Sequence, residues 1–260
     1  MIAAARRVRK PAEDSDCTHA SRYHQAMIPW LHANEAFPSI DRALADPNGL
    51  IAAGGELSTE RLIDAYRHGI FPWYSGSQPI LWWSPDPRMV LFVDEFKVSR
   101  SLRKAVSRGD FDISVDGAFH LVIEACAAPR AGHGGTWITP AMIEAYTRLH
   151  RFGYAHSVEA WVDGQLAGGL YGVAIGRMFF GESMFARMSD ASKVALFHLV
   201  EILKQRDMPL IDCQQQTPHL ASLGARLITR RAFAEALARL VNSPQPAGAW
   251  SIAAPPAQVP

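Results

Sequence analysis

The chain has 260 residues, 48% of them hydrophobic, which is enough to bury a substantial core in one large domain or two modest ones. Its formal net charge of +1 gives no global sign of nucleic-acid binding, so any RNA contact would need a local basic surface. The three cysteines, Cys17, Cys126 and Cys213, are far apart and form no CxxC pair, which argues against a disulfide framework or a zinc knuckle. We therefore expect a cytoplasmic protein without a signal peptide or membrane anchor.

Hydrophobic periodicity divides the chain into four parts. Residues 1–29 lack periodicity and residues 243–260 are rich in Pro and Ala, so both are predicted to be flexible tails. Residues 30–95 are predicted to form a small amino-terminal lobe, and residues 96–242 a larger lobe.

The small lobe is predicted to contain one helix followed by loops and short strands. Ser58 is a suitable helix cap, Leu62, Ile63 and Tyr66 recur at helical spacing, and Gly69 can end the helix in a left-handed conformation. Prolines in the aromatic segments that follow exclude a continuous central helix.

A second helix is predicted after Ser99, and its basic residues lie on overlapping faces that could follow a phosphate backbone: Arg100, Arg103, Lys104 and Arg108. A solvated helix face is the alternative. Thr139 and Pro140 begin a further helix with an apolar stripe, and Gly153 ends it.

The remaining part predicts a sheet covered by helices. Strands are expected from His156 to Phe185, broken by turns at residues 163–164 and 175–176. Ser189 or Asp190 is expected to cap a helix that runs to about Lys204; a strand over residues 209–214 and a helix after Thr229 follow. This order predicts an α+β (mixed α/β) fold.

Two sets of polar residues carry possible chemistry. Asp212 and Gln214 are two apart on a predicted strand, so their side chains would leave the same face and could orient an amine or accept its proton. The alternative is a pair that satisfies backbone groups at a strand end. Glu182 lies among large apolar residues, where it could receive an ammonium group; an ion pair with Arg187 or Lys193 is the alternative.

Aromatic residues could also stack an unpaired base, although most of them are expected to be core: Tyr66, Trp73, Trp82, Trp83 and Trp137. The sequence contains no GxxxxGK[ST], GxGxxG, HExxH or GxSxG motif. Nucleotide hydrolysis, a Rossmann cofactor, a zincin site and a serine hydrolase therefore lack support.

Several segments together resemble the bacterial leucyl/phenylalanyl-tRNA–protein transferases. They occur in the family's order between about Phe37 and Leu240, and include GIFPW (69–73), WWSPDPR (82–88), TWIT (136–139), GESMF (181–185), LIDCQ (210–214) and HLASLGA (219–225). The WWSPDPR and GESMF segments are highly specific to that family.

The resemblance implies a small lobe beside an acetyltransferase-like lobe, and a reaction without metal or coenzyme. The donor would be Leu-tRNA or Phe-tRNA, with Met-tRNA also used. The acceptor would be a protein beginning with Lys or Arg, which the transfer marks for degradation by the N-degron pathway. We expect the protein to be a monomer.

The resemblance also implies roles for individual residues. Asp212 and Gln214 become the catalytic pair and Glu182 a substrate-orienting carboxylate, with Gln214 oriented by Asp212. The aminoacyl side chain would lie among Phe179, Met184, Leu196, Leu199 and Ile211, and Leu170 is expected to be a further substrate-binding residue. Other substrate contacts are expected from Tyr66, Tyr146 and Ser183, and Trp73 and Trp137 are expected near the terminal adenosine of the tRNA.

Two other functions fit parts of the sequence. An acyl-CoA N-acetyltransferase would need a Gly-rich turn for the pyrophosphate, and the junction at residues 186–192 has no glycine and contains Asp190. A non-catalytic RNA-binding module would leave Glu182, Asp212 and Gln214 unexplained.

Overall fold

The computed structural model describes residues 28–129, 136–244 and 250. Most of the two predicted tails lies outside these residues, as does Cys17.

The helices described are α1 (Thr59–Arg67), α2 (Arg100–Arg108), α3 (Phe119–Ala127), α4 (Pro140–Arg151), α5 (Ala191–Gln205), α6 (Pro218–Ser222) and α7 (Arg230–Val241), with 3-10 turns at Ile40–Arg42 and Val93–Glu95. The strands are β1 (Trp30–Leu31), β2 (Leu50–Gly54), β3 (Phe71–Pro72), β4 (Leu81–Trp83), β5 (Arg88–Phe92), β6 (Asp112–Val115), β7 (Ala155–Val162), β8 (Gln165–Ile175), β9 (Met178–Ala186), β10 (Leu210–Gln214) and β11 (Arg226–Ile228).

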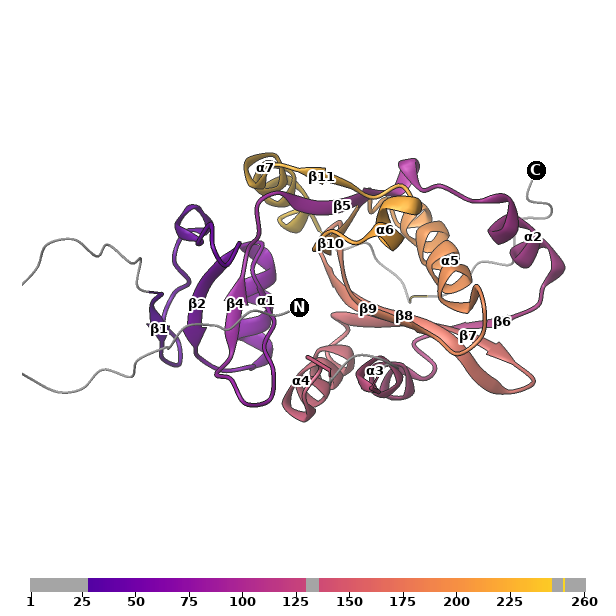
Figure 1. The fold of residues 1–260 in the computed structure, drawn as a ribbon, viewed down its shortest axis with the longest axis horizontal. Helices are drawn as coiled ribbons and strands as arrows, with labels where there is room; N and C mark the ends of the chain where they lie inside the picture. The colour runs from indigo at the N-terminus through magenta and orange to yellow at the C-terminus, as the bar shows by residue number, and fades with distance from the viewer. Residues whose placement is uncertain (1–27, 130–135, 245–249, 251–260) are drawn as a thin grey trace, which may run out of the picture.

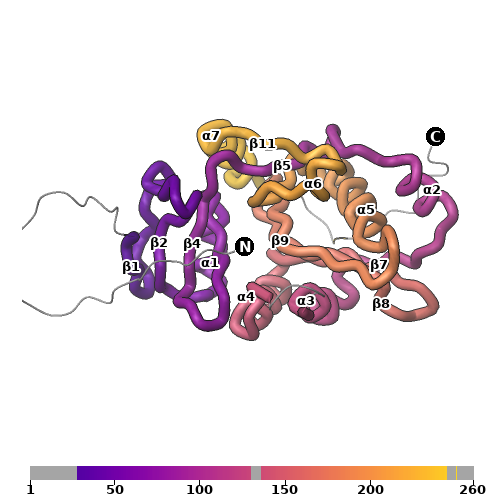
Figure 2. Tube along the Cα trace, in the orientation of Figure 1, coloured from indigo at the N-terminus to yellow at the C-terminus, as the bar shows by residue number. Residues whose placement is uncertain are grey.

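The strands form two sheets that lie side by side (Figures 1 and 2). The smaller has the order β1-β2-β4-β3, and the larger has the order β11-β5-β10-β9-β8-β7-β6. Strand β5 hydrogen-bonds within the larger sheet, although the predicted division between the lobes lies after it, at residues 95/96. The mixed α/β fold class is confirmed, and the acetyltransferase-like description of the larger lobe stays a prediction.

Helix starts follow the capping residues that the sequence predicts. The hydroxyls of Ser58, Ser99, Thr139 and Thr229 each accept a hydrogen bond from the main-chain N–H three residues on. Helix α5 differs. Asp190 precedes it with a left-handed φ of 66°, its side chain makes no capping bond, and its carboxylate binds Lys193 Nζ at 2.8 Å instead.

The centre of the larger sheet combines antiparallel and parallel pairing. Strands β7, β8 and β9 form the predicted antiparallel meander, with Gly164 and Gly176 in the turns at positive φ. Strand β10 then pairs parallel to β9 and antiparallel to β5. Helices α3 and α4 cover one face of this sheet, and α5 covers the other (Figure 1).

Two main apolar clusters pack these layers. The first runs from the smaller sheet and α1 to α3 and α4, so the two lobes share one core. The second lies between the larger sheet and α5. Trp250, from the predicted carboxy-terminal tail, packs against the second cluster and stacks on His156 with ring centroids 4.0 Å apart.

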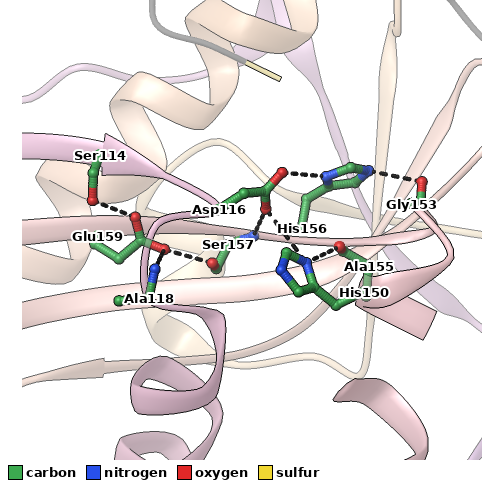
Figure 3. Close-up of polar contacts among 9 residues, drawn as sticks. All are labelled: Ser114, Asp116, Ala118, His150, Gly153, Ala155, His156, Ser157 and Glu159. Carbon is green, nitrogen blue, oxygen red and sulfur yellow. Dashed lines mark hydrogen bonds and ion pairs between the residues drawn. The ribbon is translucent and has the colours of Figure 1, made fainter. Parts of the chain in front are cut away.

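A buried polar network joins the edge strand β6 to β7 and to the start of α3 (Figure 3). Asp116 accepts bonds from His156 Nδ1 and from the Ser157 main-chain N–H, at 2.8 and 2.9 Å. The fully buried Glu159 accepts bonds from the hydroxyls of Ser114 and Ser157. Because each carboxylate receives several donors, the polar groups of this network are hydrogen-bonded, and the network stabilises the edge of the sheet.

Candidate active site

Strands β9 and β10 stop pairing at a defined point in the larger sheet. Their parallel register runs from Leu210 opposite Met178 to Asp212 opposite Phe180, and both strands continue beyond it. Each strand is irregular directly after this point, since the β8–β9 register shifts beside Glu182 and the β10–β5 register shifts between Asp212 and Gln214. Such bulges redirect side chains and commonly lie next to active sites.

Glu182 receives three hydrogen bonds from neutral donors. Tyr66 Oη of α1 and Gln214 Nε2 both donate to its Oε1, each at 2.7 Å. Tyr146 Oη of α4 donates to its Oε2 at 2.9 Å, and the hydroxyl oxygens of Tyr66 and Tyr146 also lie in close contact with each other. Among the described residues, no Lys, Arg or His forms an ion pair with Glu182, so its charge lacks a cationic partner.

This environment alters the proton affinity of the Glu182 cluster. Burial raises the pKa of Glu182 to about 7; the hydrogen bonds from Tyr66 and Tyr146 oppose this rise, and the charge of Asp212 adds to it. Burial also raises the pKa values of Tyr66 and Tyr146 well above the usual range for tyrosine, so both phenols stay protonated at neutral pH and can donate hydrogen bonds.

Asp212 lies in a different environment, because it is bound by an arginine. Arg88 donates from Nε to Oδ1 at 2.8 Å and from Nη2 to Oδ2 at 2.7 Å, and both residues are at most 1% exposed. The guanidinium group lies over the rings of Phe71 and Phe233. Sequence reasoning missed Arg88 as a site residue, although it ends the WWSPDPR segment that marks the family.

Gln214 connects the two carboxylates. Its main-chain N–H donates to Asp212 Oδ1 at 2.9 Å, and its side-chain amide reaches Glu182. The φ of Gln214 is 61°, so the regular strand alternation predicted for residues 212–214 is wrong. Asp212 therefore contacts Gln214 through the main chain and fixes the backbone from which the amide projects.

The structure rejects the alternative ion pairs of Glu182. Lys193 binds Asp190 at 2.8 Å, and Arg187 donates from Nη1 to the Leu166 carbonyl oxygen at 3.2 Å. Neither side chain reaches Glu182, because both residues lie at the junction between β9 and α5.

The predicted substrate-binding residues fall into three places. The second apolar cluster contains Leu170 and contains or contacts all five predicted pocket residues: Phe179, Met184, Leu196, Leu199 and Ile211. Trp73 and Trp137 are half-buried and pack against the first cluster, Trp73 at 5.6 Å from the Trp83 ring. Ser183 is half-buried beside Glu182 on β9. The expectation that Tyr66, Trp82 and Trp83 are core is confirmed.

The basic residues predicted to contact tRNA are exposed on α2, which lies at the end of the molecule opposite the smaller sheet (Figure 1). Arg108 pairs with Asp110. In the described part of the chain, no group of three or more His, Cys, Asp or Glu side chains is placed to hold a metal ion, and no helix has the length and apolar content needed to cross a membrane.

Comparison with known proteins assigns the chain to a family. The leucyl/phenylalanyl-tRNA protein transferase model matches residues 90–238, and the model of that family's amino-terminal domain matches residues 55–86. The chain belongs to the leucyl/phenylalanyl-tRNA–protein transferase family. This transferase is therefore an aminoacyltransferase, as the resemblance predicted.

Proteins that carry the name of this family align with most of the transferase sequence. The protein from Chromobacterium violaceum is 59% identical over 86% of this chain and 96% of its own, and that from Azoarcus sp. (strain BH72) is 59% identical over the same shares. That from Thiobacillus denitrificans is 60% identical over 83% of this chain and 94% of its own. Among solved structures, L-PGS from Bacillus licheniformis aligns with a TM-score of 0.35 at 12% identity, over 72% of this chain and 63% of its own.

Proposed function

We propose that this transferase moves leucine or phenylalanine, and also methionine, from aminoacyl-tRNA to the amino terminus of proteins that begin with Lys or Arg. The product would be marked for degradation by the N-degron pathway. We further propose that the protein acts as a cytoplasmic monomer without metal or coenzyme, and that its larger lobe is acetyltransferase-like.

The observation that best supports this reaction is Glu182, a buried carboxylate that only neutral groups bind. A buried charge without a counter-ion is costly, and a positively charged amine that entered the site would reduce that cost. Glu182 faces α1 and α4, and Phe179 and Met184 of the same strand β9 belong to the apolar cluster that packs against α5. Aminoacyl transfer requires both a group that can receive an amine and an apolar environment for the side chain of the donor ester.

The chemistry asks little of the protein beyond alignment. The donor ester is already activated, so the site must place an amine against a carbonyl carbon and manage one proton. Gln214 donates its amide nitrogen to Glu182. Its amide oxygen therefore remains to accept a hydrogen bond from the incoming α-amine, and Asp212 holds the Gln214 backbone in place.

A direct assay tests the proposed function. The full chain is incubated with separately charged Leu-, Phe- and Met-tRNA and with peptides that begin with Arg, Lys or Ala, and the products are weighed by mass spectrometry. We expect an aminoacyl adduct on the Arg and Lys peptides alone, lost when the tRNA is digested with ribonuclease and retained with a chelator.

The outcome that opposes the proposal is equally specific. Acetylation of the same peptides from acetyl-CoA, without transfer from tRNA, would replace it with the acetyltransferase alternative. A Gln214→Ala variant that retained full single-turnover transfer would contradict the proposed role of Gln214.

A further inference from the structure

The two carboxylates of the site differ in access. Asp212 is 0% exposed, and Arg88 and the Gln214 main chain occupy its oxygens. Glu182 is 9% exposed, as is Gln214, so this end of the cluster reaches the surface. Glu182 is therefore the less enclosed of the two carboxylates, and contact of a substrate amine with Asp212 would in addition require the Arg88 ion pair to open.

The two oxygens of Glu182 also differ in their remaining hydrogen-bonding capacity. A carboxylate oxygen accepts about two hydrogen bonds. Oε1 already accepts two, from Tyr66 and Gln214. Oε2 accepts one, from Tyr146, so within the described residues it keeps a position for a further donor.

We propose that Glu182 Oε2 accepts the proton from the attacking amine, and that Asp212 is a positioning residue which acts through the Gln214 backbone. This inference rests on the proposed function. It differs from the assignment that the family resemblance implies, in which Asp212 and Gln214 form the catalytic pair and Glu182 orients the substrate.

Atoms and electrons balance in this step. The neutral α-amine of the acceptor attacks the ester carbonyl carbon of the aminoacyl-tRNA, a C–N bond forms, and one amine proton passes to Oε2. The tetrahedral intermediate then breaks its C–O bond to the tRNA ribose, and the ribose oxygen takes the proton back from Glu182. The carboxylate is thereby regenerated, and no oxidant, reductant or further reactant is consumed.

The groups around Glu182 suit this exchange. Tyr66 faces it from α1, Tyr146 from α4, Tyr171 from β8 and Asp212 from β10, with Arg88 of β5 bound to Asp212. The pKa of each of the three tyrosines is raised by burial, so none of them titrates near neutral pH. With a pKa raised to about 7, Glu182 has the proton affinity that a general base needs at neutral pH.

The experiment is a pH profile of single-turnover transfer from Phe-tRNA to a saturating Arg-initiated peptide. For the wild-type protein we expect the rate to rise through about pH 7 as Glu182 ionises. The Glu182→Gln variant should be slower by roughly 10²–10⁴-fold and should lose this rise. The Asp212→Asn variant should also be slower but should keep a rise, moved to lower pH because the Asp212 charge that adds to the pKa of Glu182 is removed.

Two tyrosine variants show whether the rise in rate reports the ionisation of Glu182 or that of the acceptor amine. Tyr66→Phe removes a hydrogen bond that lowers the pKa of Glu182, so the rise should move to higher pH. Tyr74→Phe is the matched control, since Tyr74 is a buried tyrosine of the same lobe that contacts Thr139 instead. Its profile should equal that of the wild type.

Each contrary result is informative. A Glu182→Gln variant that keeps the wild-type rise, or that raises only the KM for the peptide with kcat unchanged, overturns the proton-acceptor role while the proposed function stands. A Tyr66→Phe profile that coincides with that of Tyr74→Phe overturns it in the same way. Failure of the wild-type protein to transfer at any pH overturns both proposals.

Discussion

Arg88 and Asp212, which are 124 positions apart in the sequence, form a two-point ion pair that is closed to solvent. Phe71 of the smaller sheet and Phe233 of α7 lie against the guanidinium group, with ring centroids at 4.8 and 4.5 Å from its central carbon. The pair therefore joins the smaller sheet, the larger sheet and α7 at the site that holds Gln214.

Removing one partner of this pair should strongly destabilise the fold. Arg88→Met leaves the Asp212 carboxylate buried and unpaired, so we expect a loss of about 3–5 kcal/mol in the free energy of unfolding. Urea denaturation of the wild-type protein and the variant measures this loss. Arg226→Met is the matched control, because Arg226 makes a comparable bond to Glu95 in an exposed pair, and its loss should destabilise the fold far less. Equal losses in the two variants would contradict this prediction.

Stability should also depend on pH through Glu182. Its pKa is raised to about 7 from 4.5, so between these values the folded protein binds more protons than the unfolded chain. The contribution of Glu182 to the free energy of unfolding is fully present below about pH 4.5 and is lost as pH rises through about 7. The loss is on the order of 3 kcal/mol.

Urea titrations of the wild-type protein and Glu182→Gln from pH 5 to 8 isolate this contribution. The wild-type free energy of unfolding should fall relative to that of the variant as pH rises, because the amide cannot ionise. A constant difference between the two proteins across this range would show that Glu182 titrates with an ordinary pKa.

Gly172 should tolerate no side chain. It lies on β8 beside the register shift opposite Glu182, and a Cβ there would approach the Phe179 ring to 2.5 Å and the Phe180 carbonyl oxygen more closely still. Gly172→Ala should cost about 1–3 kcal/mol by overpacking. Gly76→Ala is the control, since a Cβ at that position would meet no neighbouring atom within 4 Å and the change should stay below about 1 kcal/mol. Circular-dichroism melting of both variants tests the contrast.

The exposed basic residues of α2 should contribute to tRNA affinity. An Arg100→Gln/Lys104→Gln double variant should raise the KM for aminoacyl-tRNA, leave kcat unchanged, and reduce the slope of log affinity against log salt by about 0.7–0.9 for each lost phosphate contact. Arg231→Gln removes an exposed charge from α7 and serves as the control. Unchanged binding in the double variant would favour the alternative of a solvated helix face.

Local patterns in the sequence predicted the helices and strands well. Capping residues such as Ser58 and Thr139 lie next to the helices that they start, and the turns at Gly164 and Gly176 separate the strands β7, β8 and β9. These features depend on neighbours within a few positions. Asp190 occupies the predicted cap position of α5, but its side chain makes no capping bond because its carboxylate binds Lys193 Nζ instead.

The site could be predicted only as a set of residues. Motifs named Glu182, Asp212 and Gln214, but the partner of each depends on contacts between residues 32 to 124 positions apart, which no periodicity encodes. Strand alternation also failed at Gln214, because the bulge gives this residue a left-handed backbone.

The position of Tyr66 has a consequence for movement. Tyr66 belongs to α1, among the residues matched by the amino-terminal family model, whereas Glu182 and Tyr146 belong to the larger lobe. The proton affinity of Glu182 is thus set jointly by two separately matched segments of the chain. Any displacement of α1 away from β9 would break the Tyr66 hydrogen bond, which lowers the pKa of Glu182, and would also reduce the burial that raises it, so the position of α1 against β9 helps to set the acidity of this carboxyl group.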